Sequence, residues 1–189
     1  MKPLKLVVLL CVLLIQLSGF AQNVSTLKDF DLPDHPVKTD FTKLSSIASI
    51  TESIARNHNF YPVTRDKSSK IKSALGNIAI SNNRLFYKIR INNRSNINYD
   101  IDFIRFYVRD LKRAKRTVSQ EQEIYPVYSY GMDSPVINGK DSSTLVFAFN
   151  KFSVTRDKAF YIEIYEKNGG RHLYLKVRQA NMEKARIIR

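Results

Sequence analysis

The chain has 189 residues and carries 31 Lys and Arg against 17 Asp and Glu, which gives a formal net charge of +14 at pH 7. This length is sufficient for a domain with its own buried core. The single cysteine, Cys11, excludes an internal disulfide and a cysteine-based zinc site. The positive charge favours an acidic partner, such as envelope phosphates, an acidic protein subunit or nucleic acid, although it also promotes solubility.

Residues 1–21 have the pattern of a signal peptide. Lys2 and Lys5 precede an apolar run that ends at Leu17, and Ser18-Gly19-Phe20-Ala21 supplies small residues for cleavage after Ala21. The apolar run of about 12 residues is shorter than the roughly 20 residues of a membrane-spanning helix. We therefore predict an exported protein.

Two further segments precede the main domain. Residues 22–39 have the composition of an extended linker, because Pro33 and Pro36 alternate with aspartates. Residues 40–70 are predicted to form an amphipathic helix from Asp40 to Asn59, with Asp40 as the N-cap, followed by a basic connector. Ile50 falls outside the apolar stripe of this helix. The stripe consists of Leu44, Ile47, Ala48, Ile54 and Ala55.

From residue 71 to residue 189 the hydrophobic period changes to two, which predicts a mainly β domain. A strand over Gly76–Ser81 and a turn at Asn82-Asn83 lead to a strand whose outer face, with Phe86, Lys88 and Arg90, is expected to be basic and exposed. The next strand, Tyr99–Arg109, changes phase near Phe103, which predicts a β-bulge.

The second half of this domain continues the pattern. We predict a strand over Glu123–Tyr130, with Pro126 favouring an edge or a bulge, and then a polar loop over Gly131–Ser143. Three more strands follow, and Asn168-Gly169-Gly170 joins the last two as a hairpin. About seven strands at this spacing are typical of an immunoglobulin-like β-sandwich.

No catalytic pattern is present in the sequence. The histidines His35, His58 and His172 do not have the spacing of metal ligands, and no glycine-rich phosphate loop occurs. Glu121 and Glu123 are close in sequence, but an acid/base role would need a cleft around them. We predict a protein that is not an enzyme and that needs no cofactor or metal.

The densest positive charge lies between two predicted strands, in a loop that is the candidate partner-binding site. Tyrosines lie on the neighbouring strands, and such a mixture of basic and aromatic residues can bind single-stranded nucleic acid. Docking of an acidic partner protein and simple solvation remain alternatives. The basic residues of the loop are Lys112, Arg113, Lys115 and Arg116.

Several strings within residues 71–189 are position-specific. The longest are Asn93-Arg94-Ser95-Asn96-Ile97, the segment from Tyr99 to Tyr107, and Glu166-Lys167-Asn168-Gly169-Gly170-Arg171-His172-Leu173. Shorter ones are Lys115-Arg116-Thr117, Phe147-Ala148, Lys151-Phe152 and the terminal Lys184-Ala185-Arg186-Ile187-Ile188-Arg189. Together they resemble the C-terminal half of TraN, a protein family of Bacteroidetes conjugative transposons.

This resemblance implies a structural subunit of a conjugative, type IV secretion-like apparatus, located in the periplasm and associated with the outer membrane. Its partners would be other subunits of that apparatus and a short outer-membrane lipoprotein, which the immunoglobulin-like domain of comparable ring subunits binds. TraN proteins typically carry another β-domain before this half, and we expect it to be missing here, as in a shortened paralogue, an accessory subunit or a degenerate copy. The alternative function is a periplasmic binding module for an anionic ligand, either nucleic acid or envelope polysaccharide.

Overall fold

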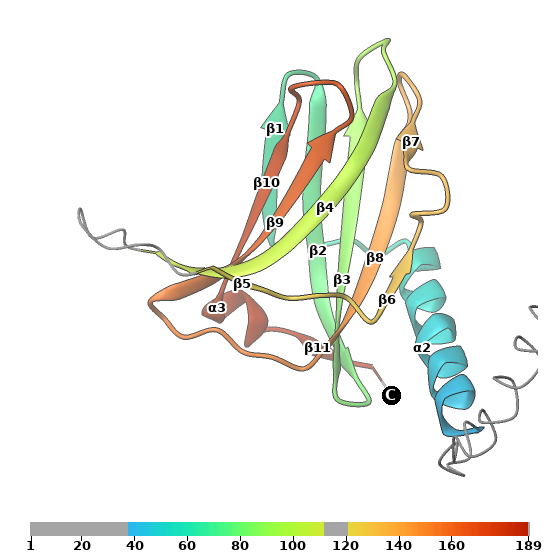
Figure 1. Cartoon of the computed structure of the whole chain (residues 1–189), viewed down its shortest axis with the longest axis vertical. Helices are drawn as coiled ribbons and strands as arrows, with labels where there is room; N and C mark the ends of the chain where they lie inside the picture. The colour runs from blue at the N-terminus through green and yellow to red at the C-terminus, as the bar shows by residue number, and fades with distance from the viewer. Residues whose placement is uncertain (1–37, 112–120, 189) are drawn as a thin grey trace, which may run out of the picture. The chain divides into compact units, whose positions relative to one another are not determined.

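The computed structural model describes residues 38–111 and 121–188, so the predicted signal peptide and almost all of the predicted linker lie outside the described residues (Figure 1). Its elements in chain order are α2 (Lys38–Arg56), β1 (Thr64–Ser68), β2 (Ile71–Ser81), β3 (Arg84–Asn93), β4 (Tyr99–Asp110), β5 (Glu121–Glu123), β6 (Tyr128–Tyr130), β7 (Val136–Ile137), β8 (Ser142–Asn150), β9 (Lys158–Glu166), β10 (Leu173–Arg178), α3 (Gln179–Met182) and β11 (Arg186–Ile187). No helix in this part of the chain is long and apolar enough to cross a membrane.

The strands form two sheets that pack face to face. One sheet has the order β1-β2-β3-β8-β6, with β11 added in parallel to β2, and the other has the order β10-β9-β4-β5, with β7 added to β4. Alternate side chains of the long strands point between the sheets, because the side-chain period of a strand is two. The buried core includes Leu75, Tyr87, Phe106, Phe147, Phe149, Phe160, Ile162 and Leu175.

The prediction of a mainly β sandwich preceded by one helix is therefore confirmed. The described residues contain eleven strands rather than about seven. The additional ones are mostly two or three residues long, which is too short to give a visible alternation in the sequence.

Two local predictions about the backbone are also confirmed. Asn82 and Asn83 have φ angles of 47° and 59° and connect β2 to β3, as two-residue hairpin turns require. The register between β4 and β9 shifts between Ile101 and Phe103, which is the predicted bulge. The shift explains why the apolar positions of β4 change faces part of the way along the strand.

The predicted single strand from Glu123 to Tyr130 is wrong. Residues 121–123 form β5 on β4, whereas residues 128–130 form β6 on β8, so this segment crosses from one sheet to the other (Figure 1). Pro126 lies in the crossing, where its missing N–H disturbs no ladder. The predicted polar loop over Gly131–Ser143 also contains β7 and the start of β8.

The predicted basic connector is likewise a strand. Residues 64–68 form β1, which pairs antiparallel with β2 from Thr64↔Leu75 to Ser68↔Ile71. The sandwich therefore begins before residue 71. The alternation of β1 was not visible in the sequence because its inward positions are Thr64, Asp66 and Ser68 rather than apolar residues.

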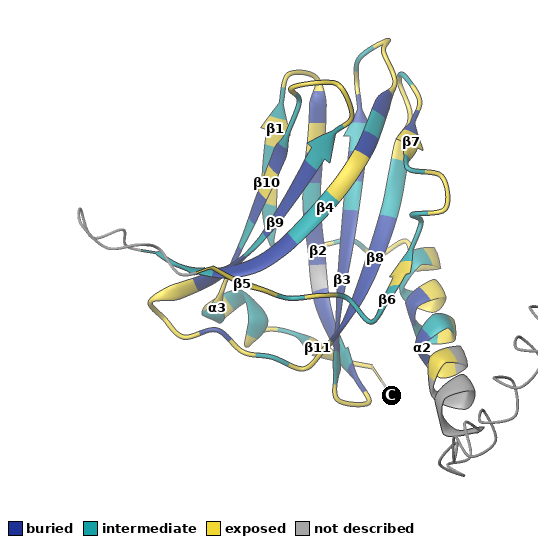
Figure 2. Cartoon of the chain, in the orientation of Figure 1, coloured by how far each residue is buried: buried dark blue, intermediate teal, exposed yellow. Residues whose placement is uncertain are grey.

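Helix α2 packs on the outer face of the first sheet. Ile47 is buried in a small second core with Ala79, Phe86 and Ala148, and Ile50 and Ile54 pack against it (Figure 2). The predicted stripe was therefore wrong at two positions, because Ile50 faces the sheet and Leu44 is 47% exposed. Asp40 lies inside the helix, which begins at Lys38, rather than at its N-cap.

The same packing overturns the prediction of an exposed basic face around Lys88. Lys88 is only 4% exposed, and its Nζ donates hydrogen bonds to the carbonyl oxygens of Ile54 (2.9 Å), Ala55 (3.1 Å) and Asn57 (2.5 Å). These carbonyls lie at the C-terminal end of α2, where the helix leaves its last acceptors unpaired and where positive charge is favourable. Burial, with a smaller contribution from the charge of Arg90, lowers the pKa of Lys88.

Candidate interaction surfaces

The predicted partner-binding residues Lys112, Arg113, Lys115 and Arg116 lie outside the described residues. The strands on either side of them are described, and they show where the loop is attached. β4 and β5 pair antiparallel, with Arg109 opposite Glu121, so the loop joins two neighbouring strands of one sheet.

Of the tyrosines considered as a stacking platform beside this loop, Tyr107 is fully buried. It lies beneath two guanidinium groups, with 4.6 Å from Cζ of Arg105 and 5.4 Å from Cζ of Arg109 to the ring centroid. These arginines form ion pairs with Glu121 and Glu123 at 2.8–3.1 Å. The base of the loop is therefore a charge-paired surface on which Tyr107 offers no ring face to a nucleic-acid base.

These ion pairs also bear on Glu121 and Glu123 as a possible acid/base pair. Hydrogen bonds from Tyr125 and Arg105 lower the pKa of Glu123, whereas a general acid at neutral pH needs a raised pKa. Among the described residues, no group of three or more His, Cys, Asp and Glu side chains could hold a metal ion. His172 instead accepts a hydrogen bond from the backbone N–H of Glu166 at 3.3 Å.

Two of the position-specific sequence strings, residues 93–97 and residues 166–173, meet at one end of the sandwich. The guanidinium of Arg171 donates to Ser95 Oγ (3.1 Å) and to the carbonyl of Asn98 (2.6 Å), and it forms an ion pair with Glu166. Arg171 thereby ties the β9–β10 hairpin to the loop between β3 and β4, which belong to different sheets.

Asn93, the last residue of β3, also holds loops together at this end of the sandwich. Its side-chain amide is buried and donates to the carbonyls of Ile97 (2.8 Å), Ile137 (3.1 Å) and Asn138 (3.1 Å).

Burial raises the pKa of Glu166, but the hydrogen bonds and charge of Arg171 outweigh burial, so the pKa lies below its ordinary value. Glu166 therefore remains ionised at neutral pH, and the residues that carry the sequence resemblance here hold loops together.

An open strand edge lies in the middle of β4. On the side away from β9, β4 pairs with β7 at Tyr99 and Asp100 and with β5 at residues 107–109. Backbone hydrogen bonds from Ile101 to Pro135 and from Ile124 to Phe106 extend these pairings by one step. Among the described residues, residues 102–105 have no strand partner on this side. The middle of β4 includes exposed positions (Figure 2).

A groove of about 440 Å³ opens beside this edge. Phe103 is 48% exposed there and stacks on Tyr165 with 4.4 Å between ring centroids, and Tyr125 is 74% exposed. The floor reaches the core at Phe106 and Phe147. The remaining lining residues are mainly apolar and include Ile104, Ile124, Pro126 and Met132.

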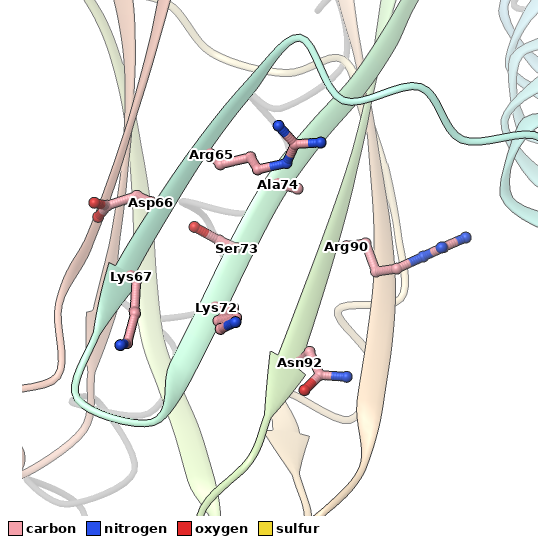
Figure 3. A pocket seen from close by; sticks show the side chains of 8 residues that line it. All are labelled: Arg65, Asp66, Lys67, Lys72, Ser73, Ala74, Arg90 and Asn92. Carbon is pink, nitrogen blue, oxygen red and sulfur yellow. The ribbon is translucent and has the colours of Figure 1, made fainter.

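A second surface lies on the outer face of β1, β2 and β3, beyond the part that α2 covers. A pocket of about 600 Å³ is lined there by residues of these three strands (Figure 3). Four of the eight lining residues are cationic: Arg65, Lys67, Lys72 and Arg90. The sequence contained these residues, but their assembly depends on the strand register, and Arg65 and Lys67 were assigned to a connector.

Fold and surfaces together define an all-β sandwich domain with a helix packed on one sheet, an open strand edge and a basic sheet face. The chain belongs to the family described as "Domain of unknown function (DUF4138)", whose family model matches residues 45–187. This match begins within α2 and extends to β11, so it includes β1 and the basic sheet face. No curated protein matches the chain.

Proposed function

We propose that this protein is a non-enzymatic structural subunit of a conjugative, type IV secretion-like apparatus that assembles through protein–protein contacts at the periplasmic side of the outer membrane. The resemblance of residues 71–189 to TraN motivates the choice of apparatus. The single structural observation that supports an assembly role is the open edge of β4 beside an apolar groove.

The edge and the groove together suit a partner segment in extended conformation. Unpaired N–H and C=O groups of a strand edge can form a ladder with an added strand, and a neighbouring pocket can bind alternate side chains of that strand. Docking would bury exposed aromatic surface of Phe103 and Tyr125. Each Å² of apolar surface buried contributes about 25 cal/mol of favourable free energy. A short apolar segment of another subunit, such as an outer-membrane lipoprotein, is therefore the partner we propose for this edge.

The basic loop offers a second contact of a different kind. Each exposed ion pair that Lys112, Arg113, Lys115 or Arg116 formed with an acidic partner would contribute only about 0–1 kcal/mol. Their summed field would instead increase the rate of association, and salt would screen it over about 8–10 Å. In this proposal the groove provides the binding affinity and the loop increases the rate of association.

Site-specific photo-cross-linking tests the groove as the contact. A photoreactive phenylalanine analogue is placed at Tyr125, and a matched copy of the protein carries it at Tyr61, which is also exposed but lies outside the groove. After irradiation of cells that contain the apparatus, we expect a defined cross-linked partner from position 125 and none from position 61. Equal labelling from both positions, or none from position 125, would contradict docking at the groove.

The loop is tested separately by changing all four of its basic residues to Ser. We expect normal folding by circular dichroism, slower assembly with the envelope complex at low salt, and a smaller difference from the unchanged protein as salt is raised. Assembly at an unchanged rate would leave the loop as a solvated segment and would not affect the groove.

A further inference from the structure

The basic sheet face contains two adjacent rows of cations that the strand register creates. Lys67 of β1 lies directly opposite Lys72 of β2, and Lys72 is opposite Asn92 of β3. In the next row, Arg65 and Arg90 lie on either side of Ala74. Neighbouring strands are about 4.8 Å apart and alternate residues of one strand about 6.6–7 Å apart, so all four charges start within a short distance of one another.

No carboxylate balances this charge among residues 38–111 and 121–188. None of the four cations forms an ion pair there. Like charges directly opposite each other on neighbouring strands destabilise a sheet, so the unpaired charge has a cost in stability. Asp66 is the one acidic residue of the pocket, and its Oδ2 accepts a hydrogen bond from the backbone N–H of Tyr174 at 2.6 Å. Figure 3 shows its carboxylate pointing away from the guanidinium groups.

The surroundings orient one of the four cations. The guanidinium Cζ of Arg90 lies 4.4 Å from the ring centroid of Phe60. Phe60 packs so closely over β2 that a Cβ at Gly76 would lie 2.7 Å from its ring. The C-terminal end of helix α2 lies over Lys88, two residues from Arg90 on β3. With a diameter of about 10 Å, the helix rises above the sheet on the same face.

From this arrangement we propose that the face formed by Arg65, Lys67, Lys72, Arg90 and Asn92 binds a compact ligand that carries two or more phosphate groups. A phosphate has three acceptor oxygens and a charge of about −1.5 to −2, so two phosphates match four cations within this volume. The guanidinium groups can bind phosphate in a bidentate manner, while the lysines act as point charges. This site is separate from the β4 groove, and its existence does not depend on the assembly role.

Two other classes of polyanion fit the face less well. Single-stranded nucleic acid binds through stacking of its bases on aromatic rings, and none of the eight residues that line the pocket is aromatic. A flat anionic membrane would have to accommodate α2, which packs on the same face and rises above the sheet. These two classes therefore serve as the competing outcomes of the test.

The test uses isothermal titration calorimetry of the full chain with inorganic triphosphate as the probe, at physiological salt. We expect triphosphate to bind, and the K67Q/K72Q variant to bind it at least about tenfold more weakly, because two charged donors are lost. The same variant should be no less stable to heat than the unchanged protein, because the substitution removes a repulsive pair.

The matched control is K151Q/K184Q, which removes the same charge from two exposed lysines outside the pocket. It should bind triphosphate with unchanged affinity. Equal weakening in both variants would show that only net charge matters and would overturn the site, as would a failure of triphosphate to bind. Tighter binding of oligothymidylate or of phosphatidylglycerol vesicles, with the same sensitivity to K67Q/K72Q, would overturn the choice of ligand.

Discussion

Phe147→Ala is expected to lower the free energy of unfolding by about 3–5 kcal/mol, because it removes a large buried ring from the centre of the core. Phe147 is 2% exposed, and its ring lies edge-on to that of Phe106 with 4.9 Å between centroids. It also forms part of the floor of the β4 groove, so the cavity would open beneath the proposed docking site.

Denaturant melts of the full chain measure this loss. Tyr87→Phe is a suitable control, because Tyr87 is also buried in the core and its hydroxyl has no hydrogen-bond partner in the described structure. Removal of an unpaired buried hydroxyl should cost nothing or stabilise the fold slightly. If Phe147→Ala lost less than about 1 kcal/mol, the assignment of this ring to the core would be wrong.

Lys88→Met is expected to destabilise the protein by about 2–4 kcal/mol although it keeps most of the side-chain length. The change removes the donor to three carbonyl oxygens at the end of α2 and leaves those acceptors without a partner beneath the helix. It also removes a positive charge from the negative end of the helix dipole. Because these bonds connect α2 to β3, the helix should separate from the sheet before the sandwich unfolds.

Hydrogen exchange of the amides in residues 47–56 tests this separation, and a melt gives the total loss of stability. Lys72→Met provides the control, because Lys72 is exposed on the neighbouring strand and is expected to change stability by less than about 0.5 kcal/mol. Unchanged protection of α2 in Lys88→Met would mean that apolar packing alone holds the helix in place.

The sequence predicts most of the sandwich because its long strands alternate clearly. The turn at Asn82-Asn83 and the bulge near Phe103 have local causes, namely positive φ and a change of phase, and both were predictable. The placement of α2 was not. Alternation assigns Phe86 and Lys88 to an outer face but does not show that a helix covers that face, so the burial of Lys88 is visible only in the structure.

The candidate surfaces depend even more on tertiary structure. The open edge of β4 exists because residues 121–130 divide between two sheets, and a sequence pattern cannot show where such a segment crosses. The basic face needs the register that places Arg65 and Arg90 on either side of Ala74, although they are distant in sequence. The loop with Lys112, Arg113, Lys115 and Arg116 was visible in the sequence by charge density alone and lies outside the described residues.

The frequency of conjugative transfer from a donor that lacks this gene tests the assembly role most directly. We expect transfer to fall to background, to return with the unchanged protein, and to remain low with Phe103→Glu, which places a charge in the groove at an exposed position. Tyr61→Glu, at an exposed position outside the groove, should restore transfer. Normal transfer from the donor without the gene would contradict the proposed function.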